Sequence, residues 1–117
     1  MTPYEIEVSE PAEMEIEAAW SYLLLRSPDA AVKLSDGLQQ AIDSLSLMPS
    51  RCPYAPENGM LDRPIRQLLY RNAGMTYRIL FIVIEATEDN PGLVRITRVR
   101  HGGQQQLGFS ADDPDEN

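Results

Sequence analysis

The chain has 117 residues, a formal net charge of −8, one histidine and a single cysteine, Cys52. That length fits one domain, and with no run of about 18 apolar residues and no charged-then-apolar leader we expect neither a membrane span nor a secretion signal. A lone cysteine cannot form an internal disulfide and fits a reducing cytoplasm, and one histidine with one cysteine cannot complete a tetrahedral metal site. We therefore expect a cytoplasmic protein without metal or cofactor.

The charge is distributed unevenly along the chain. Residues 1–50 hold nine acidic and two basic side chains, whereas residues 51–108 hold eight arginines and five acidic side chains. Residues 109–117 add four more acidic groups. Arginine is the residue best suited to bidentate contacts with carboxylates and phosphates. The second half is therefore basic, although less so than a typical nucleic-acid-binding domain.

The N-terminal third predicts a strand followed by two helices. Residues 4–8 alternate apolar and charged side chains, as in a strand with one face in water. Ser9 has the character of a helix N-cap, and apolar residues then recur at helical spacing up to about Arg26. Ser27 and Pro28 start a second helix, because serine caps and proline fits the first helical position.

The second helix carries a clean apolar stripe that Pro49 stops. Its members are Ala31, Leu34, Leu38, Ile42, Leu45 and Met48. With almost no connector, the two helices should form an antiparallel hairpin. We expect Trp20 of the first helix to lie in the core, and its four glutamates simply to face water. Those glutamates are Glu10, Glu13, Glu15 and Glu17.

Three strands are expected in the second half, after an irregular stretch at 49–64. Residues 65–71 read as a short strand, and residues 76–84 and 93–101 form a hairpin around the turn-like segment 85–92. The run 76–84 is apolar on both faces, so it should be central and covered, with Tyr77 and Phe81 in the core. The run 93–101 becomes basic at its end, where a cationic surface could meet an anionic partner.

These elements give the order β-α-α-β-β-β. We predict an α+β fold in which the helical hairpin packs on one face of a mainly antiparallel four-stranded sheet. A single domain should span residues 1–109, and residues 110–117 should form an acidic, disordered tail.

Three local sequences carry a resemblance to a known family. They are the opening strand 4–8 running into Ser9 and the helical hairpin, the pair 66–68 and 76–83, and the last strand 96–102. In this order they resemble the RelE/ParE superfamily of bacterial type II toxins over roughly residues 4–107. The resemblance implies a small cytoplasmic toxin that a wrapping antitoxin neutralises.

Two targets follow from that resemblance. RelE-like members cleave mRNA on the ribosome without a metal. Carried over, Arg78 would face the scissile phosphate, Arg66 would contact it from the next strand, and His101 would move a proton. Three further arginines would bind around the site: Arg71, Arg98 and Arg100. ParE-like members instead inhibit DNA gyrase, and no catalytic residues are recognised in them.

The residues favour the gyrase alternative. Segment 103–106 lacks the basic or aromatic residue that nuclease-type members carry there, and no lysine follows Lys33. A third alternative is a non-catalytic module that kept the fold and dimerises through its helices or an open strand edge. For Arg78 a structural role is also open, in which it pairs with Glu57 or Asp62. A toxin surface of this kind requires the guanidinium groups to converge in one shallow hollow.

Overall fold

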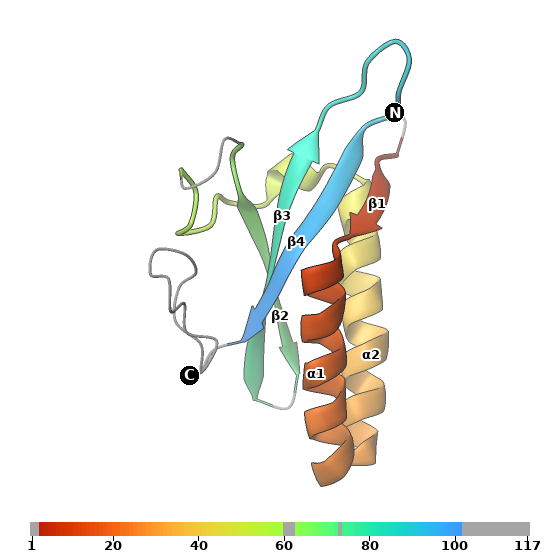
Figure 1. Cartoon of the computed structure of the whole chain (residues 1–117), viewed down its shortest axis with the longest axis vertical. Coiled ribbons are helices and arrows are strands. Elements are labelled where there is room, and N and C mark those ends of the chain that lie inside the picture. The colour runs from red at the N-terminus through yellow and green to blue at the C-terminus, as the bar shows by residue number, and fades with distance from the viewer. Residues whose placement is uncertain (1–2, 60–62, 73, 102–117) are drawn as a thin grey trace.

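The computed structural model describes residues 3–59, 63–72 and 74–101, and the predicted element order is confirmed. The elements are β1 (Glu5–Val8), α1 (Glu10–Arg26), α2 (Pro28–Asp43), β2 (Arg66–Asn72), β3 (Met75–Ile84) and β4 (Leu93–His101), with short 3-10 helices at Ser44–Ser46 and Pro49–Arg51. Figure 1 shows α1 and α2 side by side on one face of the sheet. The acidic tail predicted at 110–117 lies outside the described residues.

The sheet has the strand order β1-β4-β3-β2. β3 pairs antiparallel with both β2 and β4, whereas β1 pairs parallel with β4. The sheet is therefore mixed, with one parallel pair in an otherwise antiparallel arrangement. A parallel pair requires a crossover, and the helical hairpin begins that crossover directly after β1. The apolar strand β3 is central, as its two apolar faces predicted.

Both helices begin at the predicted serines. The Ser9 hydroxyl accepts a hydrogen bond from the Ala12 amide at 3.2 Å, and the Ser27 hydroxyl accepts one from the Ala30 amide at the same distance. Each serine thus satisfies a backbone donor that the first turn leaves unpaired. Ser9 also donates to the Thr97 carbonyl oxygen at 2.9 Å, which ties the start of α1 to β4.

The second helix ends earlier than its stripe predicted. It stops at Asp43 and tightens into a 3-10 turn, where Ser44 donates its hydroxyl hydrogen to the Ala41 carbonyl oxygen at 2.6 Å. Leu45 is still buried, but Met48 is 60% exposed and left-handed, with a φ of 50°. The prediction that Met48 belongs to the core stripe is wrong, because the residue before a proline is disfavoured in the right-handed helical region.

The core has two parts, one on each face of β3. The helix-side part contains Leu34, Leu38, Ile42, Ile79, Phe81, Val94 and Ile96 among others, and the part on the opposite face contains Ala55, Ile65, Leu80 and Ile82. Tyr77 and Phe81 are buried as predicted, whereas Trp20 is 37% exposed, so its placement in the core is wrong. Only Ala12 is buried in α1, so this helix leaves much of its apolar side chain surface outside the core.

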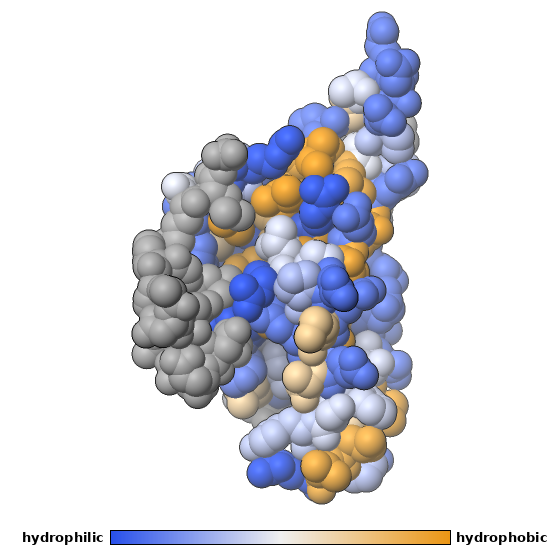
Figure 2. All heavy atoms as spheres, in the orientation of Figure 1, coloured by the Kyte–Doolittle hydropathy of each residue, from blue (hydrophilic) through white to orange (hydrophobic). Residues whose placement is uncertain are grey.

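That surplus is visible near the end of α1. Figure 2 shows apolar surface gathered at the lower end of the helical hairpin on the face that it displays. The C-terminal half of α1 exposes Tyr22, Leu24 and Leu25, the last to 85%. No helix among the described residues is long and apolar enough to cross a membrane.

A register shift between β3 and β4 decides which of their side chains share a face of the sheet. The pairing of β3 with β4 slips between Leu80 and Phe81, so that Leu80 lies opposite Arg98 and Phe81 opposite Ile96. Such a bulge bends the strand and re-aims its side chains. β1 covers β4 only from Leu93 to Ile96. The later part of β4 therefore presents its outer edge to α1 instead of to a strand.

Candidate functional site

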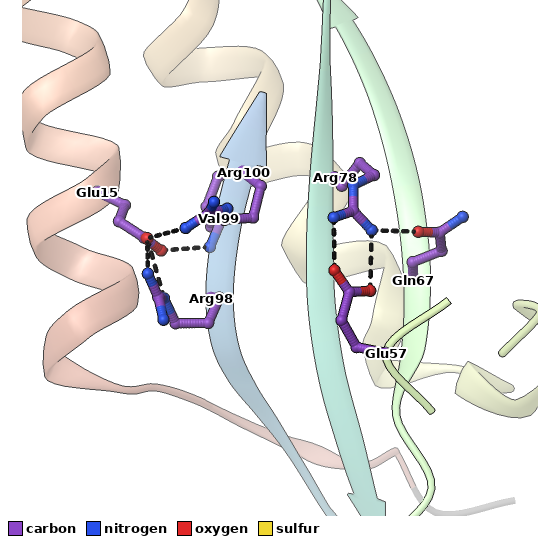
Figure 3. Close-up of polar contacts among 7 residues, drawn as sticks. All are labelled: Glu15, Glu57, Gln67, Arg78, Arg98, Val99 and Arg100. Carbon is purple, nitrogen blue, oxygen red and sulfur yellow. Dashed lines mark hydrogen bonds and ion pairs between the residues drawn. The ribbon is translucent and has the colours of Figure 1, made fainter. Parts of the chain in front are cut away.

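Arg78 holds a buried carboxylate on the sheet face opposite the helices. Its two terminal nitrogens contact the two carboxylate oxygens of Glu57 at 3.1 and 2.7 Å, and Nη1 also donates to Oε1 of Gln67 at 3.1 Å (Figure 3). The side chains are 18% and 3% exposed for the arginine and the glutamate. Glu57 is thus one of the two carboxylates considered for Arg78, and the other, Asp62, lies outside the described residues. A guanidinium committed in this way cannot grip a phosphate bidentately unless it gives up the glutamate.

A second carboxylate, that of Glu15 on α1, binds donors from the basic end of β4. One of its oxygens accepts from Arg98 Nε and Nη2 at 2.9 and 2.6 Å, and the other accepts from the Val99 amide at 2.7 Å. Arg100 Nη1 lies 3.8 Å from the same group, and the Arg100 side chain is fully buried. Figure 3 shows these donors converging on the one glutamate. Glu15 therefore closes the strand edge that β1 leaves uncovered and neutralises part of its charge.

Arg66 and Arg71 lie apart from these two clusters. Arg66 is opposite Phe81 in the sheet, and it donates through Nη1 to the Cys52 carbonyl oxygen at 2.6 Å while its guanidinium lies 4.4 Å from the Tyr54 ring centroid. Arg71 is exposed and donates to the Thr76 hydroxyl at 3.0 Å. Both side chains sit on β2, one at its start and the other near its end.

His101 lies at the end of β4, opposite Tyr77, on the face that the helices cover. The two rings meet edge to face with centroids 6.3 Å apart. Both residues line a groove of about 580 Å³ between α1 and the ends of β3 and β4. Desolvation raises the pKa of the Tyr77 phenol, with a smaller contribution from Tyr70.

The structure brings together only some of the residues that we proposed as a site. Arg78 and Arg100 lie directly opposite each other on β3 and β4, so their side chains leave the same face. Arg66 and His101 are paired with Phe81 and Tyr77, which pack on the helix side. The expected convergence of all guanidinium groups in one hollow is therefore not what the structure shows. The individual roles proposed for these residues stay predictions.

Glu15 is the residue of this region that sequence reasoning misjudged. We expected all four glutamates of α1 to face water, but Glu15 is held between Arg98 and the Val99 amide. A signal was present, because Glu15 lies three residues after Ala12 and four before Ala19, and both alanines belong to the inner stripe of α1. A carboxylate next to the packed face of a helix needs a partner, and the arginine-rich strand supplies it.

Other chemistry on the described residues is limited. Burial raises the pKa of the Cys52 thiol, against smaller opposing effects of Arg51 and Arg66, so the thiol stays protonated near neutral pH and is a poor nucleophile. In the described part of the chain, no group of three or more histidine, cysteine, aspartate or glutamate side chains could hold a metal ion. The site is therefore a set of arginine–carboxylate contacts on a sheet, suited to binding and to holding the fold.

Among curated proteins, no relative matches the sequence. A family model does match residues 6–106, and the family is described as the ParE toxin of the type II toxin-antitoxin system parDE. The match runs from β1 through the whole sheet and the helical hairpin, which are the elements of the predicted resemblance. This chain therefore belongs to the family of ParE toxins of type II toxin-antitoxin systems.

Proposed function

We propose that this protein is a cytoplasmic toxin that inhibits DNA gyrase by binding it, and that the toxin is inactive while an antitoxin is bound to it. Family membership supports the toxin and implies the antitoxin partner. The gyrase target is our inference. It follows from the way in which the arginines of the sheet are already engaged.

One observation carries this choice. Arg78 is the arginine that would face a scissile phosphate. Both of its terminal nitrogens are bound to the carboxylate of Glu57, and Glu57 is only 2% exposed. Metal-free RNA cleavage needs a base for the 2′-hydroxyl, cationic groups for the phosphorane and an acid for the leaving oxygen, all at one point. The other two groups proposed for that reaction, Arg66 and His101, belong to the opposite face of the sheet. Inhibition by binding makes no such demand.

The nuclease alternative keeps one observation in its favour. Arg78 and Arg100 are cross-strand neighbours, so two guanidinium groups leave one face side by side. A phosphate that displaced the carboxylates could bridge them. Displacing Glu57 would leave its buried carboxylate without the bidentate partner that it has now, which costs about 3 kcal/mol or more.

The test is induced expression without any antitoxin, read by microscopy, DNA integrity and the state of ribosome-bound messages. Growth arrest with DNA breaks and filamentation, together with inhibition of purified gyrase, supports our proposal. Arrest with messages cleaved on ribosomes contradicts it in favour of the nuclease. Unaffected growth contradicts both and leaves the interaction module, which a measurement of oligomeric state would then examine.

A paired substitution sharpens the choice. Replacing Glu57 with leucine and Arg78 with methionine together removes the guanidinium without leaving a lone buried charge, so the fold should persist. If inhibition of gyrase needs only a binding surface elsewhere, the E57L/R78M protein should remain toxic. Loss of toxicity in a protein that still unfolds cooperatively would show that the Arg78 guanidinium takes part in the activity.

A further inference from the structure

The outer side of α1 carries a second row of apolar and small side chains, which the core does not use. The inner row packs on the core and consists of Ala12, Ile16, Ala19 and Leu23. The outer row lies on the opposite side of the helix, at spacings of four, three and four residues, and consists of Met14, Ala18, Ser21 and Leu25. All four residues of this outer row are exposed, Met14 to 63% and Leu25 to 85%.

Exposed apolar side chains are concentrated on this helix. In the described part of the chain ten large apolar residues are exposed, and five of them belong to α1: Met14, Trp20, Tyr22, Leu24 and Leu25. In Figure 1 the C-terminal end of α1 extends beyond the strands, and Figure 2 shows apolar surface at that end. Apolar residues scattered singly are normal on a monomer, whereas a continuous set marks an interaction surface. The spacing of the outer row is the one by which a helix packs against another helix.

The charge along α1 favours a second copy of this chain as the other helix. Residues 10–17 hold four glutamates and no basic side chain, whereas residues 18–26 hold Arg26 and no acidic side chain. Two antiparallel α1 helices place each acidic half beside the half that ends in Arg26. Two parallel helices would align the acidic halves and the like ends of the helix dipoles. The surface is therefore complementary to itself, which is what a two-fold dimer requires.

The sizes of the side chains in the outer row agree with an antiparallel pair. Layers across such a pair join position 14 to position 25 of the second copy, and position 18 to position 21. The large side chains, Met14 and Leu25, then meet each other at both ends of the contact. The small ones, Ala18 and Ser21, meet in the middle, where they let the two helices approach closely.

We propose that two copies of this chain form a dimer through the outer rows of their α1 helices, packed antiparallel about a two-fold axis. The row from Met14 to Leu25 is about 17 Å long, so the contact is at the small end of protein interfaces. We expect a reversible dimer with a dissociation constant on the order of 10–100 µM. The dimer does not depend on which target the toxin has.

Sedimentation equilibrium of the full-length chain, purified alone at about 1–500 µM, measures this association. L25E should weaken it at least about 10-fold, because each dimer would bury two new carboxylates next to the acidic half of the other copy. The fold should persist, because Leu25 is 85% exposed, and thermal melting checks this. The matched control is L69E. Leu69 is 55% exposed and lies opposite Arg78, on the sheet face away from the helices, so this variant should dimerise as the wild type does.

Disulfide trapping tests the antiparallel orientation. M14C and L25C are each made with C52A, mixed in equal amounts and oxidised. A disulfide requires Cα atoms within about 7 Å of each other, so the antiparallel dimer should yield the mixed disulfide between the two variants. A parallel dimer would yield a disulfide within each variant instead.

Four results would each overturn the proposed dimer. They are a monomer over the whole concentration range, an association that L25E leaves intact, equal weakening by L69E, and a yield of mixed disulfide no higher than that of the disulfides within each variant. None of these results bears on the gyrase test, which reads growth and DNA integrity.

Discussion

Removing Arg78 alone should destabilise this protein strongly. In the R78A variant the Glu57 carboxylate, 2% exposed, loses a guanidinium that now contacts both of its oxygens at 3.1 and 2.7 Å. Breaking a buried pair from one side costs about 3–5 kcal/mol. Because the arginine side chain is 18% exposed, we expect the lower end, about 3 kcal/mol. For a domain of this size that lowers Tm by about 10–25 °C.

Thermal and urea unfolding followed by circular dichroism measure this effect. The E57L/R78M double variant should lie within about 1 kcal/mol of the wild-type free energy of unfolding, since no lone buried charge remains. The R71M variant serves as the matched control, because Arg71 is exposed and, among the described residues, its side chain hydrogen-bonds only to the Thr76 hydroxyl. It should change stability by no more than about 0.5 kcal/mol. An unchanged Tm in R78A, combined with lost toxicity, would refute a structural role for Arg78 and support a direct role of its guanidinium in the activity.

Three further predictions test the rest of the structure. E15Q should lower the free energy of unfolding by about 1.5–3 kcal/mol, because the charge-assisted hydrogen bonds from Arg98 and from the Val99 amide are weakened. E17Q on the same helix should leave the free energy of unfolding in urea unchanged. Equal values for the two variants would contradict the role of Glu15. S9A should cost more than S27A, about 2 against about 1 kcal/mol, since Ser9 caps α1 and also bonds the Thr97 carbonyl; thermal melts of the two variants decide the order. The pKa of Cys52 is raised in the folded protein, so the thiol of the unfolded chain ionises first as the pH rises; its contribution to the free energy of unfolding is full below about pH 9 and is lost at higher pH. In urea titrations between about pH 8 and 10, C52A should make the free energy of unfolding fall less steeply with pH. An unaltered slope would show that Cys52 does not cause the fall.

The elements of the fold could be predicted because local chemistry and periodicity agree along most of the chain. Ser9 and Ser27 cap their helices as their residue type predicts, and the two apolar faces of β3 place it in the centre. The misplacements fall where local signals conflict. Met48 continues the apolar stripe in sequence, but the proline after it and the Ser44 side-chain hydrogen bond end the helical geometry first.

The site could be predicted only in part, because it depends on long-range pairing. That Arg78 needs a partner follows from its place in an apolar strand, and one of the two carboxylates considered for it is the observed one. Which arginines share a face depends on the register shift between Leu80 and Phe81, and no local pattern encodes it. The role of Glu15 depends equally on how far β1 extends along β4, since a longer β1 would have taken the Val99 amide.

The parallel pairing of β1 with β4 also bears on how the protein forms. Glu7 and Arg95, joined at 3.0 Å across that pair, are 88 positions apart in sequence. During synthesis, β1 therefore leaves the ribosome long before β4, its neighbour in the sheet. Until β4 has been made, the helical hairpin cannot pack on the complete sheet. A chain released before residue 93 lacks the strand that joins β1 to the sheet. Synthesis interrupted before β4 should accordingly yield fragments that proteases remove, and the working fold should exist only once residues 93–101 have been synthesised.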